Sequence, residues 1–269
     1  MSLTGKTIAS TYKSLIKVSD ETNGITGAAS AITDGNGTQS SISMSYNSVV
    51  VIPRVSDHAG VFVVSNKAGT GLFNVNTTSN VVSAGTGGAQ QILNTQYAYF
   101  GVSSSDTQWA AQSANTHYAV PFGSCNTPIE TIANFALGTI TDPATTPVVI
   151  SDTAHDIVKA YWFIPDNITV KDVKWWVAGD ASTGDTIRAH LMSYTVDDDN
   201  GATSGDLSSG TVVASSSDIV SAGNEQIYYN SMSIDSADVD AGEVILFVFR
   251  GDGVNSDYTI NATVKYHLR

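Results

Sequence analysis

The stretch DYTINATVKYHLR, residues 257–269, decides the fold. Apolar or aromatic side chains stand at every second position, and these are Tyr258, Ile260, Ala262, Val264, Tyr266 and Leu268. The intervening positions are polar, and these are Thr259, Asn261, Thr263, Lys265, His267 and Arg269. This unbroken period of two predicts a half-buried β-strand. The preceding run VILFVF (244–249) is apolar at every position, which predicts a strand buried on both faces.

Six further segments between 146 and 256 also have strand character. They are PVVIS (147–151), DIVKAYWFIP (156–165), ITVKDVKWWVAG (168–179), DTIRAHLMSYTV (185–196), GTVVASS (210–216) and EQIYYNSMSI (225–234). Antiparallel strands of this number and length predict a C-terminal jelly-roll-like β-sandwich, which we assign to residues 146–269. The fold class is therefore predicted to be all-β.

The region before the sandwich divides into three parts. Residues 49–96 contain short strands about ten residues apart, the rhythm of a β-meander, and are predicted to form a stalk or trimerisation segment. A small sheet is marginal unless a second layer covers its apolar face, and a copy of the same chain is the simplest cover. Residues 97–145 are predicted to be an irregular connection. Residues 1–48 are too poor in apolar side chains to bury a core, and we expect an extended attachment arm that is disordered or ordered by partners.

The composition excludes several functions. The chain has 269 residues and a net charge of −13, so we expect no binding to nucleic acid or anionic membranes. No apolar run approaches about 18 residues, and we expect no membrane insertion. No signal peptide is recognisable, so synthesis in the cytoplasm is expected. The single cysteine, Cys125, excludes an intrachain disulfide.

The sequence offers little that indicates catalysis. The tripeptide GKT (5–7) lacks the preceding strand and glycine of a phosphate-binding loop. No close histidine pair or nucleophile-elbow motif occurs, and His117 lies eight residues from Cys125 without any sign of contact. We therefore expect no enzyme activity. His190 and His267 fall on polar faces of predicted strands, and a solvated or interfacial imidazole is expected at each.

Two groups of residues are candidate binding sites. Asp197, Asp199 and Asp206 lie in VDDDNGATSGD (196–206), which is a solvated hairpin loop or a weak calcium site; no other cofactor is expected. The neighbours Trp175 and Trp176, and Tyr228 and Tyr229, must point to opposite faces of a strand. One member of each pair should enter the core, and the other should face a subunit interface or a glycan.

Several segments resemble the virion structural proteins of tailed bacteriophages, especially marine ones. They are TGKTIASTYKSLIKV (4–18), SNKAGTGLFNVNTTSNVV (65–82), DTIRAHLMSYTVD (185–197), DVDAGEVILFVFR (238–250) and the C-terminal strand. The resemblance implies a non-enzymatic homotrimeric fibre or capsid decoration protein of the virion, assembled in the host cytoplasm, with an outward sandwich head. Its partners would be copies of itself and capsid or tail proteins.

The resemblance also implies a role for the N-terminal segment. Docking onto the particle would fall to Lys6, Tyr12, Lys13, Leu15 and Lys17. The alternative is a receptor- or glycan-binding tail fibre or tip module that adheres to the host surface. Location on the head or on the tail stays open.

Overall fold

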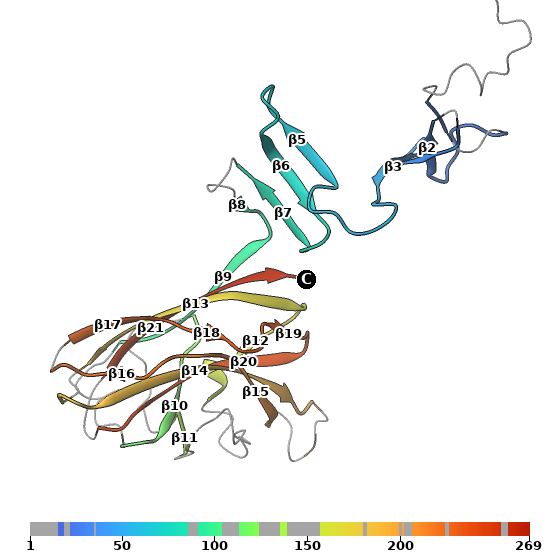
Figure 1. The fold of residues 1–269 in the computed structure, drawn as a ribbon. Helices are drawn as coiled ribbons and strands as arrows, with labels where there is room; N and C mark the ends of the chain where they lie inside the picture. Colours follow the sequence, from blue (N-terminus) through green and yellow to red (C-terminus); the bar gives the residue numbers. More distant parts are fainter. Residues whose placement is uncertain are drawn as a thin grey trace, which may run out of the picture. The chain divides into compact units, whose positions relative to one another are not determined.

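The chain is described by a computed structural model, in which two units are distinguished (Figure 1). The described residues are 16–18, 22–34, 36–85, 91–103, 113–123, 135–138, 157–179, 182–198, 201, 206–223, 226–253 and 258–269. The first unit covers Met1–Asn94 and the second Thr95–Arg269. Both consist of antiparallel sheets, which confirms the all-β fold class.

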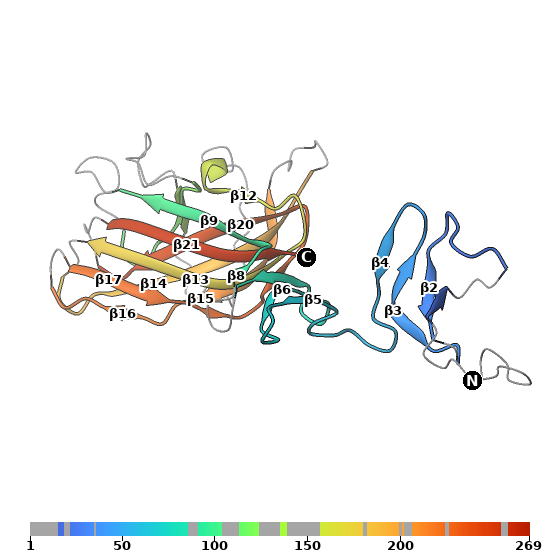
Figure 2. The same ribbon diagram turned by 90° about the horizontal axis from the view of Figure 1, so that it is seen from above.

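The second unit is a sandwich of two sheets (Figure 1). The five-stranded sheet has the order β17 (Gln226–Ser231), β13 (Ile168–Gly179), β21 (Tyr258–Leu268) and β9 (Thr95–Val102), with β19 (Asp238–Val239) paired to β13. The eight-stranded sheet has the order β11 (Ala136–Gly138), β10 (His117–Val120), β20 (Glu243–Gly251), β14 (Thr186–Val196), β15 (Leu207–Ser215) and β18 (Ser233–Ile234). In the latter sheet β12 (Trp162–Phe163) pairs with β20, and β16 (Ile219–Val220) pairs with β14. Figure 2 shows β9, β21, β13 and β17 lying side by side.

Aromatic side chains join the two sheets across the core. The ring of Phe247 on β20 lies 6.0 Å from that of Phe100 on β9 and 5.8 Å from that of Trp175 on β13. Phe249 meets Tyr258 at 5.6 Å in an edge-to-face arrangement. These rings are fully or almost fully buried, and such pairs stabilise a core by about 1 kcal/mol beyond the burial of their area.

Strand β20 is buried on both faces, as its uninterrupted apolar sequence predicts. Phe247 and Phe249 point into the sandwich, whereas Leu246 and Val248 point to the opposite face and are also 0% exposed. Strand β21 confirms the predicted alternation from Tyr258 to Val264. The alternation ends beyond that point, where Leu268 is exposed and His267 is buried.

The first unit contains two small four-stranded sheets. One has the order β1 (Lys17–Val18), β2 (Ser30–Thr33), β3 (Gln39–Met44) and β4 (Val49–Val51). The other has the order β5 (Phe62–Ser65), β6 (Gly71–Asn76), β7 (Val81–Ala84) and β8 (Gln91–Ile92). The second of these sheets is a simple meander within the predicted segment 49–96, whereas β4 of the same segment pairs with β3 in the first sheet.

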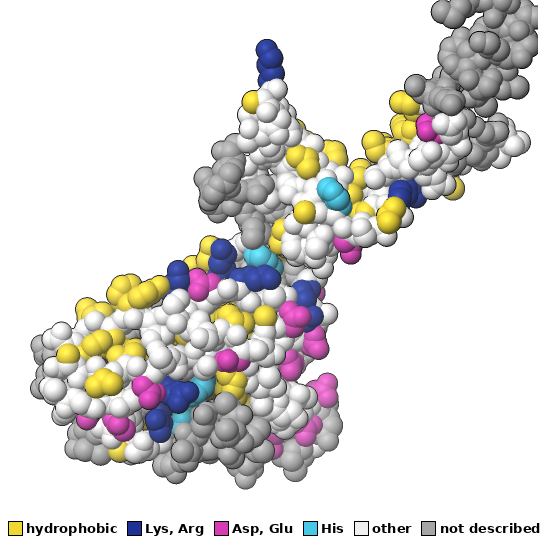
Figure 3. All heavy atoms as spheres, in the orientation of Figure 1, with side chains coloured by type: hydrophobic (Ala, Val, Ile, Leu, Met, Phe, Trp, Pro, Cys, Tyr) yellow, Lys and Arg dark blue, Asp and Glu magenta, His cyan; other side chains and the backbone are white. Residues whose placement is uncertain are grey.

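Among its described residues, the first unit has no large apolar side chain that is fully buried. Ala31 is their only buried hydrophobic residue, and the other buried side chains are Thr33, Ser43, Ser45 and Ser83. Large apolar side chains are exposed instead, among them Tyr46 at 71% and Val55 at 99%. Figure 3 shows such hydrophobic side chains distributed over the surface of this unit.

Three sequence-based expectations need correction. Of the expected irregular connection (97–145), β9 pairs with β21 and β10 with β20, so both belong to the sandwich, whose unit begins at Thr95. Within the expected strand over 156–165, the structure has a 3₁₀ turn at Val158–Ala160 and only the two-residue strand β12. The described part of the expected extended arm contains β1, β2 and β3, which pair in this order in one sheet, and the N–H of Asp34 donates to the carbonyl of Thr38 where β2 gives way to β3.

Candidate functional site

The outer face of the five-stranded sheet carries a group of exposed aromatic side chains. They are Trp176 on β13, Tyr229 on β17, and Tyr97 and Tyr99 on β9, each between 48% and 53% exposed. Ile227, at 68%, lies beside them on β17. We call this surface the aromatic face. Soluble proteins seldom leave several large aromatic side chains together on one surface without a binding function.

The strand register separates the two members of each predicted aromatic pair. Trp175 is fully buried and contacts Phe247, whereas its neighbour Trp176 points outward. Tyr228 is half-buried and packs against the core, and its hydroxyl accepts a hydrogen bond from the backbone N–H of Ala222 at 2.7 Å. Tyr229 points outward beside Trp176. Trp175 therefore enters the core as predicted, whereas Tyr228 only packs against it.

Outward-facing residues that are register partners on neighbouring strands form rows across this sheet. In one row Tyr229, Trp176 and Asn261 are register neighbours. The next row contains Ser231, Lys174, Thr263 and Tyr99, and the following one contains Asp172, Lys265 and Tyr97. Aromatic rings thus lie on β13 and β17 and on β9, and amide, hydroxyl and charged groups lie between and beside them.

Lys174 is held between the aromatic and the acidic parts of this face. Its Nζ lies 3.3 Å from Oδ2 of Asp172 in a solvent-exposed ion pair. The hydrogen bond and the charge of Asp172, together with a smaller contribution from Tyr229, raise the pKa of Lys174 above its ordinary value. The lysine therefore stays protonated throughout the neutral range.

Sequence reasoning missed Tyr97, Tyr99 and the lysines of this face. The segment QYAYFGV (96–102) indicates a strand, and the alternation in it places Tyr97 and Tyr99 on the same side. The sequence does not show, however, that this strand pairs with β21, some 160 residues later along the chain. The partner of a strand in a nonlocal pairing cannot be read from its own pattern.

A second polar region lies on the eight-stranded sheet. It is a depression of about 420 Å³ lined by residues that include Arg188, His190, Ser215 and Asp235. The hydroxyl of Ser215 donates to the carboxylate of Asp235 at 2.7 Å, and Nε of Arg188 lies 3.8 Å from Oδ1 of Asp218. His190 and His267 are 2% and 5% exposed, so the expectation of a solvated imidazole is wrong at both. These polar groups engage one another, which favours a structural role.

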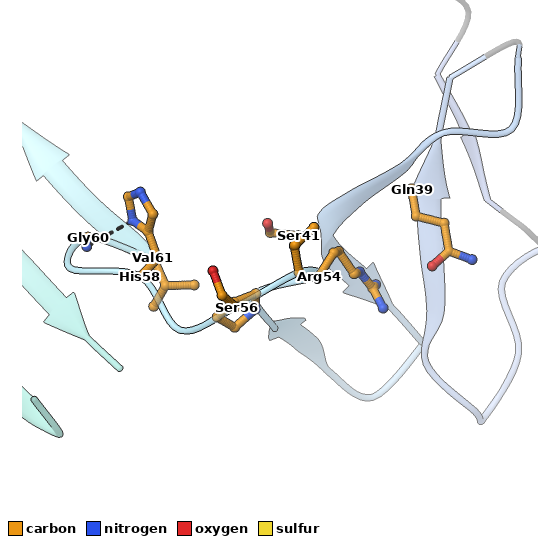
Figure 4. Close-up of a pocket in the computed structure, with 9 residues that line it drawn as sticks. Gln39, Ser41, Arg54, Ser56, His58, Gly60 and Val61 are labelled. Carbon is orange, nitrogen blue, oxygen red and sulfur yellow. Dashed lines mark hydrogen bonds between the residues drawn. The ribbon is translucent and has the colours of Figure 1, made fainter. Parts of the chain in front are cut away.

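The first unit has a depression of about 370 Å³, shown in Figure 4. Arg54 lies at one end of it, donating from Nε to the carbonyl of Ser40 at 2.8 Å and from Nη2 to the hydroxyl of Ser43 at 2.7 Å. His58 lies at the other end, where its Nδ1 accepts a hydrogen bond from the N–H of Gly60 at 3.0 Å. The labelled side chains in Figure 4 do not converge on a common point, and the bonds of Arg54 and His58 serve to fix the local backbone.

The acidic candidate for calcium binding is only partly described. Asp197 donates its N–H to the carbonyl of Asp206 at 2.9 Å, which joins the two ends of the loop, while Asp199 lies outside the described residues. The negative charge of Asp206 adds to burial in raising the pKa of Tyr161 to about 12. No group of three or more metal-ligating side chains occurs within the described residues. The calcium site stays a prediction.

Most of the predicted docking residues also lie outside the described part. These are Lys6, Tyr12, Lys13 and Leu15. Cys125, which was considered as a nucleophile, also lies outside the described residues. Lys17 is described through its backbone, which pairs with Thr33 in the first sheet. Within the described ranges, no helix has the length and apolar character that crossing a membrane requires.

The fold defines the class of the protein as all-β, with a two-sheet antiparallel sandwich as its main unit. No protein-family model matches the chain, and no curated protein matches it either.

Proposed function

We propose that the protein is a non-enzymatic structural protein that assembles with copies of itself, as a homotrimeric fibre or capsid decoration protein of a tailed-bacteriophage virion. The N-terminal segment attaches it to capsid or tail proteins, and the sandwich is the outward head. Two observations support the proposal. The first is the resemblance of the sequence to such proteins, and the second is a feature of the first unit.

That feature is the missing interior of the first unit. Its described residues contribute no member to the buried apolar cluster, all of which begins at Ala98. The unit nevertheless carries exposed Phe62, Val64, Val49 and Ile52. Sheets of four short strands are marginal without a layer that covers their apolar face. Other chains are the natural source of this layer.

The meander sheet indicates which of its faces would be covered. Cross-strand pairing places Phe62 opposite Val75 and Val64 opposite Phe73, and continues to Ala84 and Val82 on β7. These residues share one face, and on β5, β6 and β7 all of them are apolar. The rings of Phe62 and Phe73 meet there at 6.1 Å. Three copies placed around an axis would bury these faces against one another and supply the core that each lacks.

Light scattering coupled to size-exclusion chromatography of the full chain tests the assembly. We expect a mass three times that of one chain, retained on dilution. A monomer with an ordered first unit would contradict the proposal. A separate experiment tests the virion assignment. An antibody raised against the sandwich should label purified phage particles from a culture that expresses the chain. Absence of the chain from such particles would reject the assignment, whatever its oligomeric state.

A further inference from the structure

The aromatic face consists of two groups of rings separated by one strand. Trp176 and Tyr229 lie on neighbouring strands β13 and β17, and Tyr97 and Tyr99 lie on β9. Strand β21 lies between the two groups. Since strands are about 4.8 Å apart, the ring on β13 and those on β9 are separated by about 10 Å across the sheet. Such spacing suits an extended ligand with repeating units better than one small molecule.

Polar side chains occupy the strand between the rings. Asn261, Thr263 and Lys265 of β21 point to the same side as the aromatic residues. An aromatic ring packs well against the apolar C–H face of a pyranose ring, whereas the sugar hydroxyls need donors and acceptors beside it. The amide and hydroxyl groups of β21, placed between the two groups of rings, provide the second kind of contact beside the first.

The charge on this face is opposite to that of the unit that carries it. The second unit has seven Lys and Arg residues against 21 Asp and Glu residues. On the four main strands of the five-stranded sheet the charged residues are instead Lys174, Lys265 and Asp172, which stand in the rows of the aromatic face, and Lys171, which is exposed at the β-bulge between Val170 and Asp172. The short strand β19 adds Asp238, which pairs with Arg269. Asp172 pairs with Lys174, and within the described residues Lys171 and Lys265 have no ion-pair partner. Figure 3 shows Lys and Arg side chains along one part of this side of the sandwich and hydrophobic ones along another.

These two lysines attract anions despite the acidic composition of the unit. At physiological ionic strength charges farther away than about 8 Å are largely screened, so the local surplus decides what approaches the face. The lysines also argue against a second copy of the chain as the occupant. Lysine is depleted from the cores of protein interfaces, and burying Lys171 and Lys265 without partners would be unfavourable.

We propose that the aromatic face binds an acidic polysaccharide. Pyranose rings pack on Trp176 with Tyr229 and on Tyr99 with Tyr97, and carboxylate or sulfate groups of the same chain meet Lys171 and Lys265. This binding site goes beyond the assembly function and does not depend on it, because all its residues belong to one sandwich.

Affinity electrophoresis of the full chain in gels that contain alginate, dextran sulfate or neutral dextran tests the proposal. Alginate offers carboxylates and dextran sulfate offers sulfate esters, so the stronger retardation identifies the anionic group. We expect either anionic polymer to bind at least about tenfold more tightly than dextran, with affinity falling as salt rises. Trp176→Ala, and separately the double change Lys171→Gln with Lys265→Gln, should each weaken binding by about tenfold.

Matched variants outside the face serve as controls. Val220→Ala removes an exposed apolar side chain from the other sheet, and Lys67→Gln removes a lysine from the first unit. Both should bind like the unaltered chain, and circular dichroism should show all variants folded. Equal affinity for dextran, or unchanged binding by the Trp176 and lysine variants, would overturn the proposal. A drop in oligomeric mass on Trp176→Ala would do so as well, because it would identify the face as a contact between copies.

Discussion

The rings of Trp176 and Tyr229 lie with their centroids 4.8 Å apart and their planes at 49°, although the residues belong to different strands. Each is about half exposed, at 50% and 48%. Trp175, the immediate neighbour of Trp176, is fully buried in the core. Substitution of Trp175 should therefore affect mainly the stability of the sandwich, and substitution of Trp176 should affect mainly the binding of a ligand.

Trp175→Ala should destabilise the sandwich far more than Trp176→Ala. Removing the buried ring leaves a cavity beside Phe247 and should lower the free energy of unfolding by about 3–5 kcal/mol. Removing the exposed ring loses mainly its contact with Tyr229, which corresponds to about 1 kcal/mol. Urea denaturation followed by far-UV circular dichroism measures both. Similar losses for the two variants would show that the assignment of the faces is wrong.

The pKa of Lys174 should depend on Asp172. The hydrogen bond and the charge of Asp172 are the main causes that raise it, so Asp172→Asn should lower this pKa toward the ordinary lysine value. Tyr229→Phe should lower it by less, because Tyr229 contributes the smaller part. Titration of the lysine side-chain carbon signals by NMR measures the change. A larger effect from Tyr229→Phe than from Asp172→Asn would contradict the order of causes.

The sequence predicts those parts of the fold that depend on local pattern. Strict alternation locates β21, and the apolar run locates β20, because burial on one or both faces leaves a direct mark on residue order. The adjacent pairs at 175–176 and 228–229 reveal that one ring of each faces outward. Pattern fails at Val158–Ala160, which lies in a predicted strand but forms a 3₁₀ turn.

The candidate site could be predicted only in part, because it is assembled from distant strands. Tyr99 reaches the aromatic face through pairing with Thr263, and Tyr97 through pairing with Lys265. Nothing in residues 95–102 specifies this partner, since any strand of suitable length offers the same backbone groups. The burial of His267 was missed for a similar reason: the period of two places it on the polar side but does not reveal its surroundings.

Stability should decrease below about pH 6.5 through His267. Burial first, and then the charges of Lys171 and Lys265, lower the pKa of this imidazole in the folded chain from the ordinary value of 6.5. At higher pH the ring is neutral in both states and contributes nothing. As pH falls through 6.5 the unfolded chain takes up the proton first, which favours unfolding until the pH reaches the lowered folded pKa.

The variant His267→Gln isolates this contribution. The difference in unfolding free energy between it and the unaltered chain should be constant above about pH 6.5 and should shift in favour of the variant below it. Lys265→Gln should reduce the shift, because it removes one of the charges that lower the pKa. Urea denaturation at a series of pH values measures the difference, and a constant difference over the whole range would refute the assignment.

The turn that leads into β20 requires glycine at position 242. Gly242 has a φ of +91°, and its N–H donates to the carbonyl of Ile164 at 2.8 Å. A Cβ would find open space there, so the cost of Gly242→Ala comes from the backbone conformation alone, about 1–2 kcal/mol. Gly223→Ala is the matched control, since that glycine is outside the left-handed region and its Cβ would make only an ordinary contact. Thermal unfolding should distinguish the two.

Adjacent valines on β5 provide the sharpest test of assembly. Val64 lies on the apolar face of the meander sheet opposite Phe73, whereas Val63 lies on the other face opposite Asn74. Their exposed fractions are nearly equal, 47% and 45%, so an aspartate is tolerated to the same degree at both positions in a lone chain. In an assembly that buries the apolar face, Val64→Asp places a carboxylate in the shared core, whereas Val63→Asp leaves the carboxylate outside it.

We therefore expect Val64→Asp to reduce the mass measured by light scattering from that of a trimer to that of a monomer, and Val63→Asp to leave it unchanged. The sandwich should remain folded in both variants, because its core contains no residue before Ala98. Loss of the trimer in both variants alike would place the contact elsewhere in the first unit. A trimer that survives both substitutions would show that the copies are not held together by the apolar faces of the meander sheet.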